Sequence, residues 1–93
     1  MKISQIIWLQ RVVEKVEKKH NLRWEEVEEV FTNRPQYRFL EFGDIEGEDV
    51  YGAYGRSDSG RYVTVIFILK SGGRALIVTS RDMDRKERKK YGK

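Results

Sequence analysis

The residues best suited to chemistry lie close together near the end of the chain, between Arg81 and Tyr91. Arg81 and Arg88 carry planar guanidinium groups, which can donate two hydrogen bonds to one phosphate group. Glu87 and Tyr91 carry groups that can accept or donate a proton. Cleavage of RNA by the ribose 2′-OH needs a base, an acid and cations that stabilise the phosphorane. These residue types therefore predict phosphate binding, with groups for proton transfer nearby.

Each of these residues also has a structural interpretation. Arg81 could form an ion pair with one of three carboxylates, which belong to Asp82, Asp84 and Glu48. Glu87 follows Asp84 at the spacing of a helix capping box. Tyr91 is the one large apolar side chain that could anchor a helix at this end of the chain. The sequence leaves both interpretations open.

Candidates also lie elsewhere in the chain. His20 is the only side chain whose ordinary pKa is near neutrality, but it also continues the apolar stripe of the first expected helix. Arg56 and Arg61 flank a turn at residues 58–60 and could extend a basic surface or be ordinary solvated side chains. Arg56 shares one strand face with Gly52 and Tyr54, where the missing glycine side chain could admit a ligand.

Charge and composition limit the classes of function. The chain has a formal charge of +4, and residues 81–93, with seven Lys or Arg and three Asp or Glu, account for all of it. This segment favours a polyanionic partner such as nucleic acid, although a solvated tail would have the same composition. With no cysteine and one histidine, the chain predicts no metal site and no cofactor. The absence of a long apolar run and of a signal-peptide pattern leads us to expect a cytoplasmic protein without membrane contact.

The elements that must position these residues follow from the apolar pattern. Residues 4–19 predict a helix with Ser4 as a possible N-cap, and its apolar stripe consists of Ile6, Leu9, Val13, Val16 and His20. A second helix is expected over residues 24–31 and a third over residues 85–91. Strands are expected over residues 37–42, 50–56, 61–70 and 74–81. The sequence thus predicts a single α+β domain over residues 1–93, with two N-terminal helices, a four-stranded, mainly antiparallel meander sheet and a short C-terminal helix.

Three details can be predicted for the packing of these elements. Residues 62–69 are apolar at successive positions, so this strand should be central in the sheet and covered on both sides. Arg81 has the same parity along its strand as Ala75 and Ile77, so the three side chains share one face if the strand is regular. Trp8 is expected to be a core residue.

Several segments, in the right order and at the right distances, resemble the BrnT family of bacterial toxins. The likeness begins with Trp8 and Lys19-His20 and continues through residues 24–31 and Pro35. It then includes residues 53–57, Gly60-Arg61 and the apolar residues 63–67. Its most specific part is residues 77–83, which are followed by Arg85-Lys86-Glu87-Arg88 and Tyr91.

The resemblance implies a RelE/ParE-like fold and an endoribonuclease that halts growth as the toxin of a type II toxin–antitoxin system. It implies RNA as the substrate and, as the partner, a BrnA-like antitoxin protein, a family often made of ribbon-helix-helix DNA binders. Under this interpretation the predicted catalytic residues are Arg81, Arg88, Glu87, His20 and Tyr91. The predicted RNA-binding residues are Arg56, Arg61, Arg85, Lys86 and Lys89. The protein could assemble as a homodimer or as a toxin–antitoxin hetero-oligomer.

Three positions depart from the family pattern. Val12, Val16 and Val50 stand where polar residues are common in the family. These valines are consistent with a tighter core or with a weakened active site. Two alternatives therefore stay open: a non-catalytic protein of the same fold that binds nucleic acid or an antitoxin, and a ParE-like toxin that blocks gyrase by contact.

Overall fold

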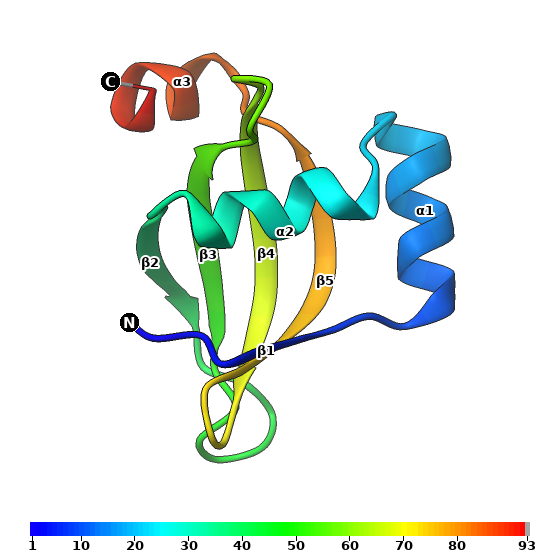
Figure 1. Cartoon of the computed structure of the whole chain (residues 1–93). Helices are drawn as coiled ribbons and strands as arrows, with labels where there is room; N and C mark the ends of the chain where they lie inside the picture. Colours follow the sequence, from blue (N-terminus) through cyan, green and yellow to red (C-terminus); the bar gives the residue numbers. More distant parts are fainter. Residues whose placement is uncertain (93) are drawn as a thin grey trace.

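The computed structural model describes residues 1–92 and shows helices packed on a five-stranded sheet (Figure 1). In chain order the elements are β1 (Gln5–Ile7), α1 (Gln10–His20), α2 (Trp24–Thr32), β2 (Gln36–Glu41), β3 (Val50–Arg56), β4 (Tyr62–Lys70), β5 (Arg74–Asp82) and α3 (Arg85–Tyr91). The strands lie in the order β1-β5-β4-β3-β2. Strand β1 is parallel to β5, and the other neighbours are antiparallel. The predicted α+β class and the meander of four strands are confirmed.

The start of the chain forms a strand where the sequence predicts a helix. Strand β1 pairs with β5, and α1 begins only at Gln10, so Ile6 and Leu9 lie outside the helix. The Ser4 hydroxyl donates to the Gly72 carbonyl at 2.6 Å instead of capping a helix. Helical periodicity does not reveal that the edge of β5 needs a partner for its main-chain groups. The predicted sheet is therefore one strand short, and the sheet is mixed.

The core lies between α1, α2 and one face of the sheet (Figure 1). Its buried apolar side chains come from both helices, the link between them and the three central strands: Val12, Val16, Leu22, Val27, Val30, Ala53, Val63, Val65, Phe67, Ala75 and Ile77. Trp8 packs against this cluster, as predicted, and its indole N–H donates to the Glu28 carboxylate at 2.9 Å. Two of the valines that depart from the family pattern, Val12 and Val16, are thus core residues.

A β-bulge interrupts the pairing of β5 with β4. Ile66 of β4 lies opposite Thr79, whereas the next residue, Phe67, lies opposite Ile77. Val78 is therefore an extra residue in β5. Because side chains alternate along a strand, the extra residue reverses the faces on which the following side chains lie.

The bulge turns Arg81 away from the core. Arg81 pairs with Thr64 and lies on the sheet face that α1 and α2 do not cover, whereas Ala75 and Ile77 face the core. The prediction that Arg81 shares a face with Ala75 and Ile77 is wrong, because it assumed a regular strand. This reversal decides which side chains Arg81 can meet.

Strand β4 is central, as predicted, with two strands on each side. One of its faces packs under the two N-terminal helices. On the other face α3 covers only the end near Thr64, and Ile66 and Ile68 remain half-buried. The prediction that this strand is covered on both sides therefore holds for one face only. Arg81 and Glu87 meet on this uncovered face.

Candidate active site under the C-terminal helix

A capping box fixes the start of α3, as the sequence spacing predicts. The Asp84 carboxylate accepts from the Glu87 N–H at 2.8 Å, and the Glu87 carboxylate accepts from the Asp84 N–H at 2.9 Å. The preceding Met83 is buried, and its N–H donates to the Tyr62 carbonyl at 3.1 Å. These contacts set the direction in which α3 leaves β5 and crosses the uncovered face of the sheet.

Arg81 and Glu87 form a bidentate ion pair where α3 lies over the sheet. Arg81 Nη1 and Nη2 donate to the two carboxylate oxygens of Glu87 at 2.6 and 2.9 Å. The hydroxyl of Thr64, which is fully buried, donates to the same carboxylate at 2.9 Å. The Arg81 side chain is 38% exposed and the Glu87 side chain 17%, so solvent and ligands can reach the arginine.

Hydrogen bonds determine the charge state of this pair. Burial raises the pKa of Glu87, but hydrogen bonds from Arg81, the Asp84 N–H and Thr64 together outweigh it, so the net shift is downward. The hydrogen bond to Glu87 raises the pKa of Arg81 more than burial lowers it. Both groups are therefore ionised at neutral pH, and Glu87 is a weak base as long as Arg81 holds it.

Tyr91 anchors α3 to the sheet, one turn beyond Glu87. Its ring stacks on Tyr54 of β3, with centroids 4.0 Å apart and planes inclined by 12°. Tyr54 lies across Gly52, where an added methyl group would come within 2.7 Å of the phenolic oxygen. The gap that the sequence predicts at Gly52 is thus filled by Tyr54 itself. Arg38 of β2 donates from Nη1 to the Tyr91 hydroxyl at 3.3 Å.

Arg88 and Arg56 lie on an adjacent part of this face, beside Tyr62. The guanidinium carbon of Arg88 is 3.9 Å from the centroid of the Tyr62 ring, and that of Arg56 is 4.7 Å from it. Both arginines are exposed. One aromatic ring therefore orients two cations on the surface, next to the Arg81–Glu87 pair.

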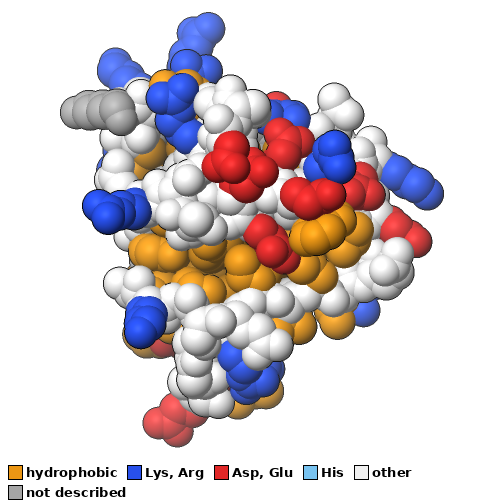
Figure 2. Space-filling view, in the orientation of Figure 1, with side chains coloured by type: hydrophobic (Ala, Val, Ile, Leu, Met, Phe, Trp, Pro, Cys, Tyr) orange, Lys and Arg blue, Asp and Glu red, His pale blue; other side chains and the backbone are white. Residues whose placement is uncertain are grey.

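The remaining predicted RNA contacts lie on the exposed surface of α3. Arg85, Lys86 and Lys89 are all exposed. Figure 2 shows Lys and Arg side chains around the end of the molecule where α3 lies, while Asp and Glu side chains gather over α2. A phosphate backbone would thus be attracted to the α3 end of the molecule.

Arg61 and His20 belong to a different cluster, on the core side of β5. Arg61 donates to both carboxylate oxygens of Asp82 at 2.6 and 3.0 Å, and to the carbonyls of Asn21 and His20 at 2.7 and 3.2 Å. Hydrogen bonding to Arg61 outweighs burial and lowers the pKa of Asp82. Asp82 lies opposite the buried Val63, on the face of β5 away from Arg81. Arg61 therefore fastens the end of α1 to β5.

The structure brings together three of the predicted catalytic residues, Arg81, Glu87 and Tyr91, and sets Arg88 beside them. Sequence reasoning did not identify Thr64 or Arg38, which complete this cluster. The signal for Thr64 was slight, a single hydroxyl within an apolar strand.

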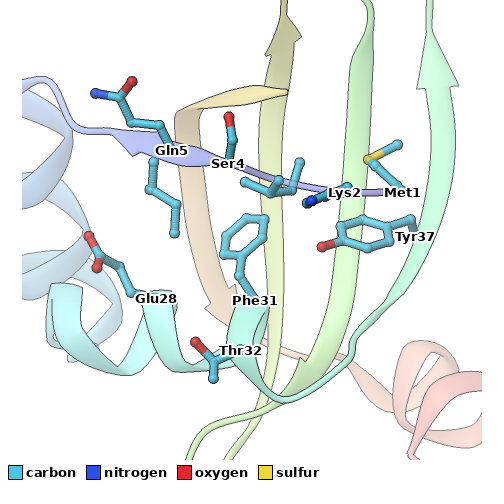
Figure 3. Close-up of a pocket in the computed structure, with 10 residues that line it drawn as sticks. Met1, Lys2, Ser4, Gln5, Glu28, Phe31, Thr32 and Tyr37 are labelled. Atoms are coloured by element: carbon cyan, nitrogen blue, oxygen red, sulfur yellow. The ribbon is translucent and has the colours of Figure 1, made fainter. Parts of the chain in front are cut away.

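A pocket of about 500 Å³ lies between the N-terminal strand and α2 (Figure 3). Phe31 and Tyr37 are among the side chains that line it. Its carboxylate, from Glu28, already accepts the hydrogen bond from Trp8. None of the described residues lining this pocket is an arginine, so it has no counterpart of the pair under α3.

Among residues 1–92, no group of three or more His, Cys, Asp or Glu side chains is placed to hold a metal ion. No helix formed by these residues is long and apolar enough to cross a membrane.

Known proteins resemble this chain in structure and in sequence pattern. The structure is similar to the crystal structure of the Brucella abortus ribonuclease toxin BrnT, with a TM-score of 0.60 and 15% sequence identity over 90% of this chain and 100% of that chain. No curated protein sequence matches the chain. The family model of the ribonuclease toxin BrnT, of type II toxin–antitoxin systems, matches residues 8–87, a range that includes Arg81 and Glu87. The chain therefore belongs to the BrnT family of ribonuclease toxins of type II toxin–antitoxin systems.

Proposed function

We propose that the Arg81–Glu87 pair is the catalytic centre of this toxin and that it cleaves RNA internally without a metal ion. In this mechanism the ribose 2′-OH attacks the adjacent phosphorus, and Arg81 binds the phosphate oxygens on which negative charge develops. Glu87 takes the proton of the 2′-OH, and the Tyr91 hydroxyl gives a proton to the leaving 5′ oxygen. The products are a 2′,3′-cyclic phosphate and a free 5′-OH. Because the proposed substrate is RNA, we also propose that this activity takes place in the cytoplasm.

The observation that supports this proposal is the arrangement of the Arg81 guanidinium on the Glu87 carboxylate. A phosphate group offers the same planar pair of acceptor oxygens as the carboxylate, so it can compete for the arginine. When Arg81 turns to the phosphate, Glu87 loses the two hydrogen bonds from Arg81 and keeps those from Thr64 and the Asp84 N–H, so its pKa is lowered less. The carboxylate then becomes a stronger base only when the substrate is present.

The valines that depart from the family pattern are compatible with this centre. Val12 and Val16 lie in the core beneath α1, on the other side of the sheet from Arg81. Val50 lies opposite Ile68, at the other end of β3 from Tyr54. Of the two interpretations of these valines, the tighter core fits the positions of Val12 and Val16.

Incubation of the purified protein with a defined single-stranded RNA tests the proposal. We expect fragments with 2′,3′-cyclic phosphate and 5′-OH ends, at the same rate with and without EDTA. RNA binding without fragments would leave a non-catalytic binding protein, and fragments that disappear with EDTA would contradict the metal-independent route. Inhibition of DNA supercoiling with intact RNA would instead indicate a gyrase-directed toxin.

The type II family implies an antitoxin protein as partner, and we propose that it covers the edge of the sheet at β2. This strand has one strand neighbour, β3, and its outer edge presents main-chain groups that can pair with another strand. Phe39 and Leu40 of β2 are 42% and 37% exposed, and Phe42, just after the strand, is 80% exposed. A Phe42→Ser substitution should weaken co-purification with the antitoxin and leave RNA cleavage unchanged, whereas unaltered co-purification would place the interface elsewhere. The mass of the protein alone in solution would show whether it forms a homodimer.

A further inference from the structure

A small pocket opens beside the Arg81–Glu87 pair, between β2, β3 and α3. Its volume is about 260 Å³, and its lining includes Leu40, Glu87, Lys86, Lys90 and Tyr91. Glu87 belongs both to this pocket and to the ion pair with Arg81. A group bound in the pocket would therefore lie next to a phosphate bound at Arg81.

We propose that this pocket binds one nucleoside of single-stranded RNA, the neighbour of the scissile phosphate. The inference rests on the proposed function for the position of that phosphate. The base would lie against Leu40 and the Tyr91 ring, and the phosphate that follows it would lie near Lys86 and Lys90. The pocket then selects where the strand is cut, while Arg81 and Glu87 perform the cleavage.

The walls of the pocket suit the two chemical parts of a nucleotide. Leu40 is 37% exposed, so its side chain provides an apolar surface for a base. The stack with Tyr54 holds the Tyr91 ring in one orientation. The Lys90 ammonium lies 5.5 Å from the centroid of that ring, close enough to reach a phosphate beside a stacked base. Aromatic surfaces with flanking cations are the usual way in which proteins bind single strands.

The size of the pocket argues for one nucleoside. Pockets for drug-sized ligands have volumes of roughly 300–1,000 Å³, and this pocket lies just below that range. A base inside a duplex remains stacked and paired, so only an unpaired nucleotide can place its base in such a space. The proposal therefore requires a single-stranded region at the cleavage site.

A second pocket of similar size, about 270 Å³, provides a natural comparison. It lies at the other end of β3 and is lined by Phe42 and Ile45 together with three acidic residues, Glu41, Asp44 and Glu48. Its apolar side chains would suit a base equally well, but its carboxylates repel a phosphate. The pocket beside Glu87 is instead lined by three cations, Arg38, Lys86 and Lys90, against the one carboxylate of Glu87, and this excess of positive charge distinguishes it as a nucleotide site.

The test compares two identical substitutions in the two pockets. Leu40→Glu places a carboxylate against the proposed base, and Ile45→Glu places one in the acidic pocket at a position that is 61% exposed. Binding is measured by fluorescence anisotropy with a single-stranded RNA whose 2′-OH groups are methylated, so that it cannot be cleaved. We expect Leu40→Glu to weaken binding about tenfold or more, since base stacking contributes on the order of 1–3 kcal/mol. The affinity of the Ile45→Glu protein for this RNA should stay within about twofold of that of the unaltered protein.

Cleavage patterns separate this inference from the proposed function. On an RNA of mixed sequence, the Leu40→Glu protein should cut with altered base preference, and Leu40→Ser, a milder change, should show the same direction. Equal binding and identical cleavage positions in all variants would overturn the pocket but leave catalysis at Arg81 and Glu87 intact. Selective loss of binding in Leu40→Glu, with no cleavage even by the unaltered protein, would support the pocket and overturn the proposed catalytic function. Circular dichroism of each variant is the control that the protein is folded.

Discussion

Glu87 connects α3 to two strands of the sheet through a single carboxylate. It accepts hydrogen bonds from Arg81 of β5, from Thr64 of β4 and from the Asp84 N–H at the start of the helix. In the absence of RNA, this carboxylate has a structural role, because its hydrogen bonds hold α3 on the sheet. Arg81 is the more exposed member of the pair, so it is the partner that can exchange the Glu87 carboxylate for a phosphate group.

The downward pKa shift of Glu87 predicts a pH-dependent contribution to stability. The ordinary value is 4.5, and the value in the folded protein is lower. The ionised group therefore stabilises the fold above about pH 4.5, and this contribution is lost as the pH falls through the lower folded value. The difference in free energy of unfolding between the unaltered protein and Glu87→Gln, measured in urea, should be larger at pH 7 than at pH 3. A difference that does not change with pH would contradict the hydrogen-bond geometry.

At the residue scale, the sequence predicts part of this cluster. Arg81 and Glu87 lie six residues apart in one charged segment, and the capping spacing from Asp84 is visible without a structure. Thr64 lies 23 residues before Glu87, and nothing in an apolar strand indicates which distant carboxylate its hydroxyl will meet. His20 has the right chemistry, but its position on α1 places it on the core side of β5, with Asp82.

At the element scale, α3 depends on contacts outside itself. It has seven residues, and a helix of that length is not stable alone in water. The capping box, the Arg81–Glu87 pair and the Tyr54–Tyr91 stack hold it on the sheet. The site exists only while this helix is docked, because Glu87 and Tyr91 both belong to it.

Substitution of the capping residue tests this dependence. Asp84→Ala removes the side-chain acceptor for the Glu87 N–H and should destabilise the protein by about 1 kcal/mol. Cleavage of RNA should fall as well, because a frayed α3 no longer positions Glu87. Asp44→Ala, at an exposed position between β2 and β3, is the matched control and should change neither quantity. Unchanged cleavage by the Asp84→Ala protein would show that the docking of α3 is not needed for activity.

The sequence predicts the helices and strands better than it predicts how they pair and pack. The meander strands and α3 could be predicted because periodicity and capping are local signals. β1 could not, since its residues also fit a helical pattern and only pairing with β5 makes them a strand. The bulge at Val78 could not either, because an extra residue in a strand is visible only against the partner strand. That one residue decides that Arg81 faces α3 and not the core.

At the scale of the whole molecule, opposite charges lie at opposite ends. Residues 85–90 have five Lys or Arg and one Glu, whereas residues 41–49 have five Asp or Glu and no Lys or Arg. Figure 1 shows α3 at one end of the sheet and the loop between β2 and β3 at the other. An approaching polyanion is thus oriented before contact, with its phosphates toward α3.

Charge reversal at two places tests this orientation. The double substitution Lys86→Glu, Lys89→Glu on α3 should weaken binding of a non-cleavable RNA and make the dependence of log affinity on log salt less steep, because fewer counterions are released. The double substitution Lys18→Glu, Lys19→Glu on α1 changes the net charge equally and also affects exposed positions. It should alter binding much less. Equal losses in both proteins would mean that only net charge, and no particular surface, attracts RNA.

We also expect residues 1–93 to unfold as one unit. The buried apolar cluster joins α1, α2 and strands β3, β4 and β5 without a division into two groups. Thermal unfolding followed by far-ultraviolet circular dichroism and by tryptophan fluorescence should give the same midpoint. Two separate transitions would contradict the single-domain interpretation.

The rate of single-turnover RNA cleavage tests the proposed catalytic role of Arg81. Arg81→Gln removes the cation and leaves a shorter, neutral polar side chain, and Arg74→Gln makes the same change at the other end of β5. With both proteins folded, we expect Arg81→Gln to lower the cleavage rate by about 100-fold or more, in the range typical of losing a transition-state donor, and Arg74→Gln to cleave at the unaltered rate. Cleavage by the Arg81→Gln protein at the rate of the unaltered protein would mean that Arg81 has no catalytic role.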